Sequence, residues 1–106
     1  MSEIVSYDFH GFKFTWTSDK AATNIEKHGV SFEVACQAVV NDVQVVEEQL
    51  EEGERRFAII SFPLSECMTV LLWVVVADDG EAWRIVTARR TTPAERRRYE
   101  EEIGSY

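Results

Sequence analysis

Residues 68–90 read MTVLLWVVVADDGEAWRIVTARR, and their pattern sets the fold class that we predict. Met68–Ala77 is apolar at both odd and even positions, as in a central strand covered on both faces, although periodicity alone also allows a buried helix. Five β-branched residues in this run favour the strand. The turn residues 78–80 then signal a hairpin, and Trp83–Arg89 gives the returning strand. We therefore expect an antiparallel hairpin at the centre of a sheet.

Three further strands are predicted earlier in the chain. Phe12, Phe14 and Trp16 alternate with polar residues, which is the period of a strand with one buried face. A β-branched run predicts the second strand, and an apolar run ended by Pro63 predicts the third. The acidic segment Glu47–Glu54 is too charged to be buried, so we expect it to connect these two strands. The three strands are expected at 12–16, Val43–Val46 and Phe57–Phe62.

Two short helices are predicted to form a hairpin across Gly29. Side-chain oxygens at residues 17–19 can accept hydrogen bonds from the open N–H groups of a helix over Lys20–His28. Gly29 ends this helix, and Ser31 can cap the next one. One stripe of each helix recurs at helical spacing: Ala21, Ile25 and His28 in the first, and Phe32, Ala35, Cys36 and Val39 in the second.

The last helix has the clearest start signal in the chain. Thr92 at the N-cap, Pro93 at N1 and Glu95 at N3 match a capping box, and Ala94–Ile103 continues without a breaker before Gly104. Three arginines lie four residues before three glutamates, so we interpret this face as a solvated surface held by weak ion pairs, in preference to a phosphate site. The expected pairs are Arg96 with Glu100, Arg97 with Glu101 and Arg98 with Glu102.

The elements together predict one α+β domain over residues 1–106. The chain has a mass of 12.2 kDa and 45% apolar residues, enough for a core of its own. We expect an antiparallel sheet of four to five strands, with two N-terminal helices on one face and one C-terminal helix nearby.

A reducing, cytoplasmic location is expected from the cysteines. Cys36 and Cys67 are too few and too far apart for a zinc cluster, and each lies in an apolar run where a buried free thiol is expected. No signal peptide is visible at the N-terminus. The longest apolar run, Val70–Ala77, is well short of the roughly 20 residues of a spanning helix, so we expect no membrane association.

Charge is distributed unevenly along a chain whose net charge is -8. The first half, residues 1–54, holds three lysines against eleven carboxylates, whereas residues 55–106 hold all eight arginines against eight carboxylates. The planar guanidinium binds phosphate oxygens in two-point fashion and stays protonated at any working pH. The second half therefore predicts an anion site on an otherwise acidic protein.

The ordered motifs resemble those of the BrnT family of toxins over about Phe12 to Tyr99. The residues that carry the resemblance are Phe14 to Trp16, Lys20 to Ala22, Asn24, Lys27 to Phe32, Ala35, Gly53 to Arg56, Arg84 to Arg90, Glu95 and Arg96. Members of that family are the toxins of type II toxin–antitoxin pairs, are similar to RelE-like ribonucleases in fold, and are neutralised by a ribbon-helix-helix antitoxin called BrnA. The resemblance implies a chain that cleaves RNA, inhibits translation, binds a BrnA-like antitoxin and meets DNA only indirectly, through that antitoxin.

Cleavage of RNA without a metal ion sets the chemistry required of the side chains. The 2′-hydroxyl attacks its own phosphodiester, so the site needs a proton acceptor, a proton donor and cations over the phosphorane. The candidate cations are Arg56, Arg84, Arg89 and Arg90. Strand alternation predicts Arg84 and Arg90 on one face of the last strand and Arg89 on the other, unless the end of the strand twists. No metal or cofactor is expected, because no phosphate-binding glycine loop and no zinc-binding His–Glu spacing is present.

Two candidates come from the first helix. His28 is the natural acid–base group because its ordinary pKa lies near neutrality, yet a histidine in the last turn of a helix also stabilises the helix dipole. Because of this effect on the dipole, we prefer a structural role for His28 to an acid–base role. Lys20 lies near the helix N-terminus, where a cation is unfavourable, and this favours a functional role.

A second class of function is a catalytically weak or inactive binding module that keeps only the antitoxin interface. The acidic first half repels a polyanion, which supports this alternative. Convergence of Arg56, Arg84 and Arg89 or Arg90 near His28 or Lys20 would favour catalysis. Pairing of each arginine with a carboxylate such as Glu54 or Glu95 would favour the binding module.

Overall fold

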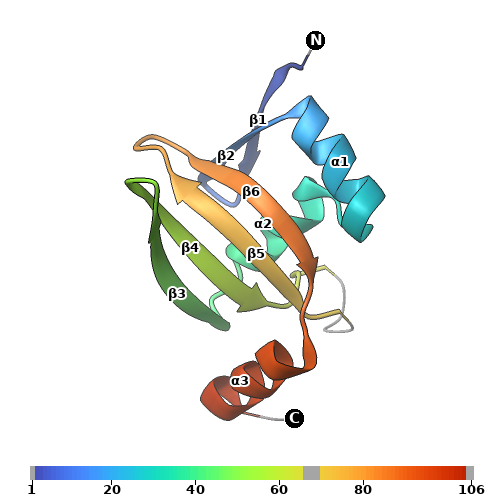
Figure 1. Ribbon diagram of the computed structural model, residues 1–106, viewed down its shortest axis with the longest axis vertical. Coiled ribbons are helices and arrows are strands. Elements are labelled where there is room, and N and C mark those ends of the chain that lie inside the picture. Colours follow the sequence, from blue (N-terminus) through green and yellow to red (C-terminus); the bar gives the residue numbers. More distant parts are fainter. Residues whose placement is uncertain (1, 66–69, 105–106) are drawn as a thin grey trace.

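Over its described residues, the protein is a six-stranded mixed sheet with two helices on one face and a third helix at its end (Figure 1). The computed structural model describes residues 2–65 and 70–104. The elements are β1 (Ile4–Phe9), β2 (Phe12–Thr17), α1 (Ser18–His28), α2 (Phe32–Val39), β3 (Gln44–Glu51), β4 (Glu54–Ser61), β5 (Leu72–Asp78), β6 (Trp83–Arg90) and α3 (Pro93–Ile103). The sheet order is β1-β2-β6-β5-β4-β3. This confirms the α+β class and the central β5–β6 hairpin.

The sheet has more strands than the expected four or five, because the N-terminal residues also form one. β1 pairs antiparallel with β2 at the edge of the sheet. Its side chains alternate, with Ile4 exposed and Val5, Tyr7 and Phe9 packed against the core. Polar residues on the solvent side weaken the apolar pattern of such an edge strand. One pairing in the sheet, β2 with β6, is parallel, since the chain crosses over through α1, α2 and the strands between.

The acidic segment Glu47–Glu54 is a hairpin and not the expected connection. β3 and β4 pair across it up to Glu51 and Glu54, and the turn uses positive φ at Glu52 and Gly53 (54° and 76°). Burial is not required here, because one edge of β3 is free and its carboxylates project into water or meet arginines of β4. High charge therefore does not prevent strand formation at the edge of a sheet.

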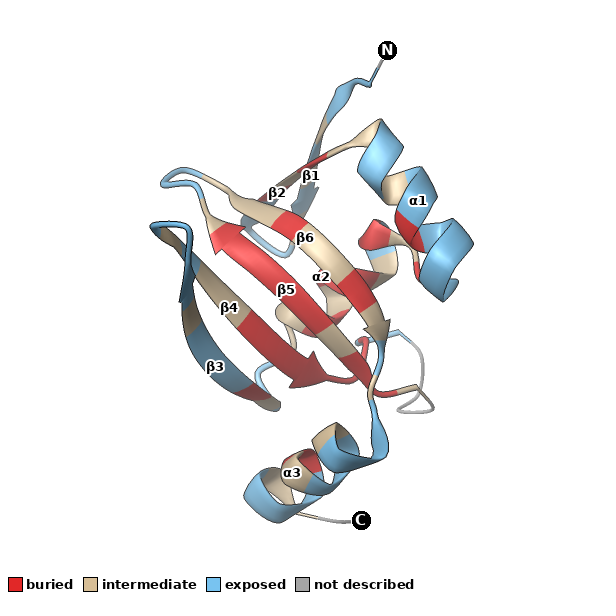
Figure 2. Cartoon of the chain, viewed as in Figure 1, coloured by how far each residue is buried: buried red, intermediate tan, exposed pale blue. Residues whose placement is uncertain are grey.

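The main core lies between the sheet and the helices α1 and α2. Its buried residues include Phe14 and Trp16 of β2, Phe32 of α2 and Ile85 of β6. Figure 2 shows that β5 is buried along most of its length, as expected for a central strand. Cys36 also lies here as a buried free thiol, and burial raises its pKa to about 12. Cys67 lies outside the described residues.

The start signals of all three helices are confirmed. Thr17, Ser31 and Thr92 each accept a hydrogen bond from a backbone N–H three residues on, and Gly29 ends α1 in the left-handed conformation with φ 71°. Glu95 completes the capping box by accepting from the Thr92 N–H at 2.8 Å. No helix in the described part of the chain is long and apolar enough to cross a membrane.

α3 packs on the opposite face of the sheet over a smaller core. Tyr99 and Ile103 of α3 contact an apolar group that includes Val45, Ile60 and Phe62. Two of the expected ion pairs along α3 form, Arg96 with Glu100 at 3.6 Å and Arg98 with Glu102 at 2.8 Å. Among the described residues, Arg97 and Glu101 form no such pair. The rest of this face is not covered by a helix, and we call it the open face (Figure 1).

Candidate active site

A β-bulge in β6 decides which arginines share the open face. Val75 is the register partner of Thr87, whereas the next residue, Val76, is the partner of Ile85, so β6 has one extra residue at this point. Ile85 and Ala88 are therefore both buried on the helix side although they are three residues apart. The expected arrangement of the arginines of β6 is wrong for this reason. Arg84 and Arg89 lie together on the open face, and Arg90 lies on the other.

Arg56 and Arg84 stand in one row across three strands. Ala77 of β5 is the register partner of both, so it lies between them. Two strand spacings separate the backbones of the arginines by about 10 Å. Ala77 is fully buried, and its methyl group leaves a low floor between the two longer side chains.

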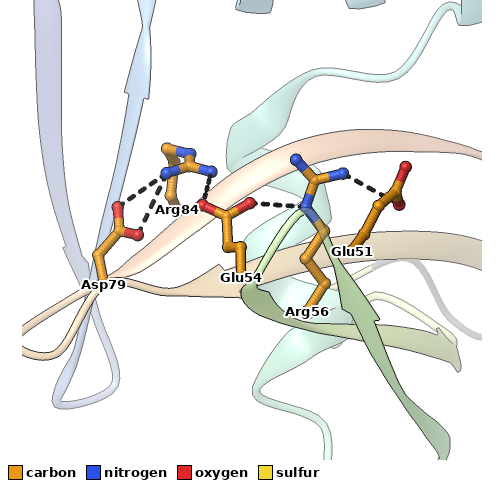
Figure 3. Close-up of polar contacts among 5 residues, drawn as sticks. All are labelled: Glu51, Glu54, Arg56, Asp79 and Arg84. Carbon is orange, nitrogen blue, oxygen red and sulfur yellow. Dashed lines mark hydrogen bonds and ion pairs between the residues drawn. The ribbon is translucent and has the colours of Figure 1, made fainter.

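A continuous chain of ion pairs crosses this row (Figure 3). Glu54 lies at its centre and accepts hydrogen bonds from Arg84 Nη2 at 2.5 Å and from Arg56 Nε at 2.7 Å. Asp79 accepts from Arg84 Nη1 at 3.1 Å, and Glu51 from Arg56 Nη1 at 3.3 Å. Three carboxylates thus alternate with two guanidinium groups, so the chain of pairs has a net negative charge.

The pairing changes the protonation of its central members. Hydrogen bonds from Arg84 and then Arg56 hold the pKa of Glu54 below its usual value. The same bond to Glu54 raises the pKa of Arg84. Glu54 is therefore ionised at neutral pH, and it is a weaker base than an ordinary glutamate while the two cations hold it.

Arg89 is held separately, at the start of α3. Its two terminal nitrogens donate to the Glu95 carboxylate at 2.8 and 2.9 Å, and its guanidinium lies 3.9 Å from the centre of the Trp73 ring. The bond from Arg89 is the main reason that the pKa of Glu95 lies below its usual value. Arg89 thereby joins β6 to the capping box of α3.

The other predicted site residues lie away from the open face. Arg90 lines a groove on the helix side of the sheet, together with Val30 and Leu72. Lys20 and His28 line a second groove, of about 300 Å³, between α1 and β6. We call this second cavity the α1 groove, and its lining residues are Asp19, Lys20, Thr23, Asn24, Lys27, His28, Val86 and Thr87. The arginines of the open face do not converge on Lys20 or His28, and Arg56, Arg84 and Arg89 are each paired with a carboxylate. Of the two functions weighed from the sequence, this arrangement favours the binding module.

Asn24 is a positioning residue that the sequence pattern did not reveal. It is the buried residue of α1, whereas Ile25, expected on the core stripe, is 50% exposed. The Asn24 side chain donates to the carbonyls of Val30 and Ala88 at 2.9 and 2.8 Å and accepts from the Ala88 N–H at 3.2 Å. It acts as a short strand partner for β6 and fixes α1 against it. A lone asparagine one position from an apolar stripe was the available signal.

Glu54 is the second residue that was not predicted to belong to the site itself. Its position between two arginines of different strands depends on the register of β4, β5 and β6, which no local pattern specifies. Within residues 2–65 and 70–104, no group of three His, Cys, Asp or Glu side chains could hold a metal ion. The row of Arg56, Ala77 and Arg84 thus offers two cations with one ionised carboxylate between them.

Comparison with known families identifies the chain. A family model described as ribonuclease toxin, BrnT, of type II toxin-antitoxin system matches residues 16–95. The match covers more than half of the chain and includes Glu54, Arg56, Arg84 and the α1 groove. No curated protein sequence matches significantly. The chain belongs to the BrnT family of ribonuclease toxins from type II toxin–antitoxin systems.

Proposed function

We propose that this toxin cleaves RNA on the open face, with Arg56 and Arg84 at the phosphate and Glu54 as the proton acceptor, and that no metal ion takes part. Loss of messenger RNA would then inhibit translation. A BrnA-like ribbon-helix-helix antitoxin would neutralise the toxin and supply its only link to DNA.

The observation that supports this proposal most is the position of the Glu54 carboxylate. Two guanidinium groups from different strands bind its two oxygens at 2.5 and 2.7 Å. A phosphodiester presents the same kind of oxygen acceptors, so an RNA phosphate could take bonds from both groups if Glu54 moved aside by one rotamer. The site would thereby bind the phosphate and keep a carboxylate beside it.

The reaction then balances without a cofactor. Glu54 takes the proton of the 2′-hydroxyl as the 2′-oxygen forms its bond to phosphorus. The bond from phosphorus to the 5′-oxygen breaks, and the leaving oxygen takes a proton from water at this partly exposed site. The hydroxide that remains takes the proton from Glu54, which restores the carboxylate. Arg56 and Arg84 stabilise the added charge of the phosphorane, which is worth about 3 kcal/mol for one well-placed donor. The products are a 2′,3′-cyclic phosphate and a free 5′-hydroxyl.

The remaining candidates act at a distance from the bond that breaks. Val86 and Thr87 of the α1 groove follow Arg84 by two and three residues on β6. RNA that continues from the open face around β6 would meet Lys20 and His28 there, and these side chains would bind its backbone. Arg89 would orient α3 through Glu95, and Arg90 would contact RNA beyond the end of β6.

Glu54→Gln tests the proposal because it removes the proton acceptor and keeps the size of the side chain. We expect cleavage to fall by about 100-fold or more, with RNA affinity equal or higher, since the two arginines lose a competing anion. Glu51→Gln is the matched control, because Glu51 also pairs with Arg56 but is more exposed and does not touch Arg84. Cleavage of a synthetic RNA in EDTA is the measurement. Equal rates for Glu54→Gln and the wild type would refute the role of Glu54, and loss of wild-type cleavage in EDTA would refute metal independence.

One observation favours a second function, that of a non-catalytic binding module. Three carboxylates already neutralise Arg56 and Arg84, and a net negative row repels RNA. In this case the chain would keep only its antitoxin interface. Purified wild-type protein that is folded, free of antitoxin and unable to cut either naked or ribosome-bound messenger RNA would establish this alternative.

The antitoxin proposal is supported by charge. A protein with a net charge of -8 associates rapidly and selectively with a basic, DNA-binding partner. Co-expression with the neighbouring gene should give one co-purifying complex. Independent elution of the two proteins at micromolar concentration would count against this partner.

A further inference from the structure

We propose that the antitoxin is anchored by a basic amphipathic helix that docks in an apolar groove on the helix side of the sheet, the face opposite to the arginines of the open face. The inference rests on the proposed antitoxin partner and assigns it a surface. The groove has a volume of about 310 Å³ and lies between the end of α2, the turn after β1 and the strand β3. Its apolar lining includes Phe12, Val39, Val40, Val46, Phe57 and Trp83. We call it the α2 groove.

The α2 groove is open because the helices cover only part of this face. α2 ends at Val39, and β3 lies at the edge of the sheet with its helix-side residues unprotected. Phe12 is 44% exposed and Val46 is 46% exposed. Leu50, four residues after Val46 on the same side of β3, is 75% exposed. Large apolar side chains that gather at one cavity mark a protein-binding surface more often than the scattered ones of an ordinary surface. Apolar anchors at helical spacing are one recurrent way of filling such a groove.

The charge around the α2 groove selects the partner. Asp42 belongs to its lining, and Glu48 and Asp78 lie in the adjoining rows of β3 and β5. Arg55 is the cation of these rows, and it is already paired with Glu48 at 2.9 Å and Asp78 at 3.9 Å. Three carboxylates against one guanidinium favour a helix whose apolar stripe is flanked by lysine or arginine. A second copy of this chain would bring another net charge of -8 to an acidic rim, so self-association is disfavoured.

The two faces can be tested separately. Val46 lines the groove, and its side chain points away from Arg56 and Arg84, because Val46 pairs with Ile59 of the helix-side core. Val46→Lys places a charge in the groove at an exposed position. Val43→Lys is the matched control, since Val43 has nearly the same exposure, 42%, and does not line the groove. The probe is a BrnA-like ribbon-helix-helix antitoxin, with affinity measured by titration calorimetry on full-length proteins.

We expect Val46→Lys to weaken the complex by at least tenfold and Val43→Lys by less than twofold, with wild-type circular dichroism and growth arrest in both variants. The wild-type affinity should fall as salt rises, because the rim and the helix are oppositely charged. Equal affinities for the two variants would overturn the groove assignment while leaving the antitoxin partner in place. Protection of β3 amides from hydrogen exchange, without an effect of Val46→Lys, would show strand addition at the edge and also overturn it. Absence of any wild-type complex would overturn the groove and the antitoxin proposal together, and RNA cleavage, measured separately, would still test the catalytic proposal.

Discussion

The two faces of the sheet are built from the same strands but are held together by different forces. On the helix side, apolar residues of β2, β5 and β6 pack against α1 and α2 in the larger core. On the other side, α3 covers a smaller apolar group, and the open face beside it carries paired charges (Figure 3). Packing of apolar surface contributes far more to stability than partly exposed ion pairs do. The residues that contribute most to fold stability and the charged residues available for chemistry therefore lie on opposite faces of one sheet.

The helix side should show the largest effect on stability. Phe32 is almost fully buried and packs edge to face against Trp16, with 5.6 Å between the centroids of the two rings. Phe32→Ala is expected to lower the free energy of unfolding by about 3–5 kcal/mol, because it leaves a cavity in the larger core. Urea denaturation measures this, with the exposed Leu50→Ala as a control that should cost less than about 0.5 kcal/mol. A loss below about 1 kcal/mol for Phe32→Ala would contradict the division of roles between the faces.

On the open face, a substitution should reduce RNA cleavage strongly and stability only slightly. Arg84→Ala removes a donor to Glu54 and Asp79, and we expect RNA cleavage to fall by about 100-fold, which corresponds to about 3 kcal/mol in the barrier. The free energy of unfolding should change by only about 1 kcal/mol, since the pairs are partly exposed. Arg97→Ala is the control, because it removes the same charge from an exposed site on α3. Unfolding of Arg84→Ala at ordinary temperature would show that the ion pairs, too, support the fold.

Asn24 is an exception to this division between the faces, because it is polar yet lies on the helix side. Asn24→Ala leaves the N–H and carbonyl of Ala88 and the carbonyl of Val30 without their side-chain partner. We expect a loss of about 2–3 kcal/mol in the free energy of unfolding, since each buried backbone group is costly to leave unpaired. Thr23→Ala, an exposed neighbour on α1, should change stability little. Equal melting temperatures for the two variants would mean that Asn24 does not hold α1 to β6.

Elements with strong local signals could be predicted from the sequence. The Asp-Asp-Gly turn indicated the β5–β6 hairpin, and the capping box of Thr92 and Glu95 indicated α3. β1 and the acidic hairpin were missed because an edge strand can expose one side to water, which weakens the apolar pattern. A polar stretch does not show by itself whether it will pair as an edge strand or remain a loop, because that depends on the strand beside it in the fold.

The candidate site depended even more on tertiary structure. Arg56 and Arg84 were predicted as separate cations, but their meeting at Glu54 requires the register of three strands. The bulge opposite Val75 and Val76 moved Arg89 to the face of Arg84, which strict alternation of side chains excludes. Lys20 and His28 were candidates for the same site, and the structure places them in the α1 groove, apart from these arginines. Residue type could be predicted, whereas adjacency across strands could not.

The smallest change in the free energy of unfolding is expected at the contact between the open face and α3, and its size depends on pH. Glu95→Gln removes the charge that faces Arg89 but keeps an acceptor for the capping box, so it isolates the ion pair. We expect a loss of about 1 kcal/mol in the free energy of unfolding at pH 7, measured by urea denaturation. The pKa of Glu95 is lowered in the folded protein, so its stabilising contribution is complete above the unfolded value of about 4.3 and disappears as the pH falls through the folded value.

The difference between the wild type and Glu95→Gln should therefore be constant from pH 7 to about pH 5 and vanish in stronger acid. Glu100→Gln is the matched control, because Glu100 faces Arg96 at the longer distance of 3.6 Å on an exposed part of α3. That variant should differ little from the wild type at any pH. A Glu95→Gln difference of the same size at pH 3 and pH 7 would show that the glutamate stabilises α3 through its shape and hydrogen bonds alone. The ion pair with Arg89 would then contribute nothing to the joint between α3 and the sheet, and packing would hold both faces of the molecule.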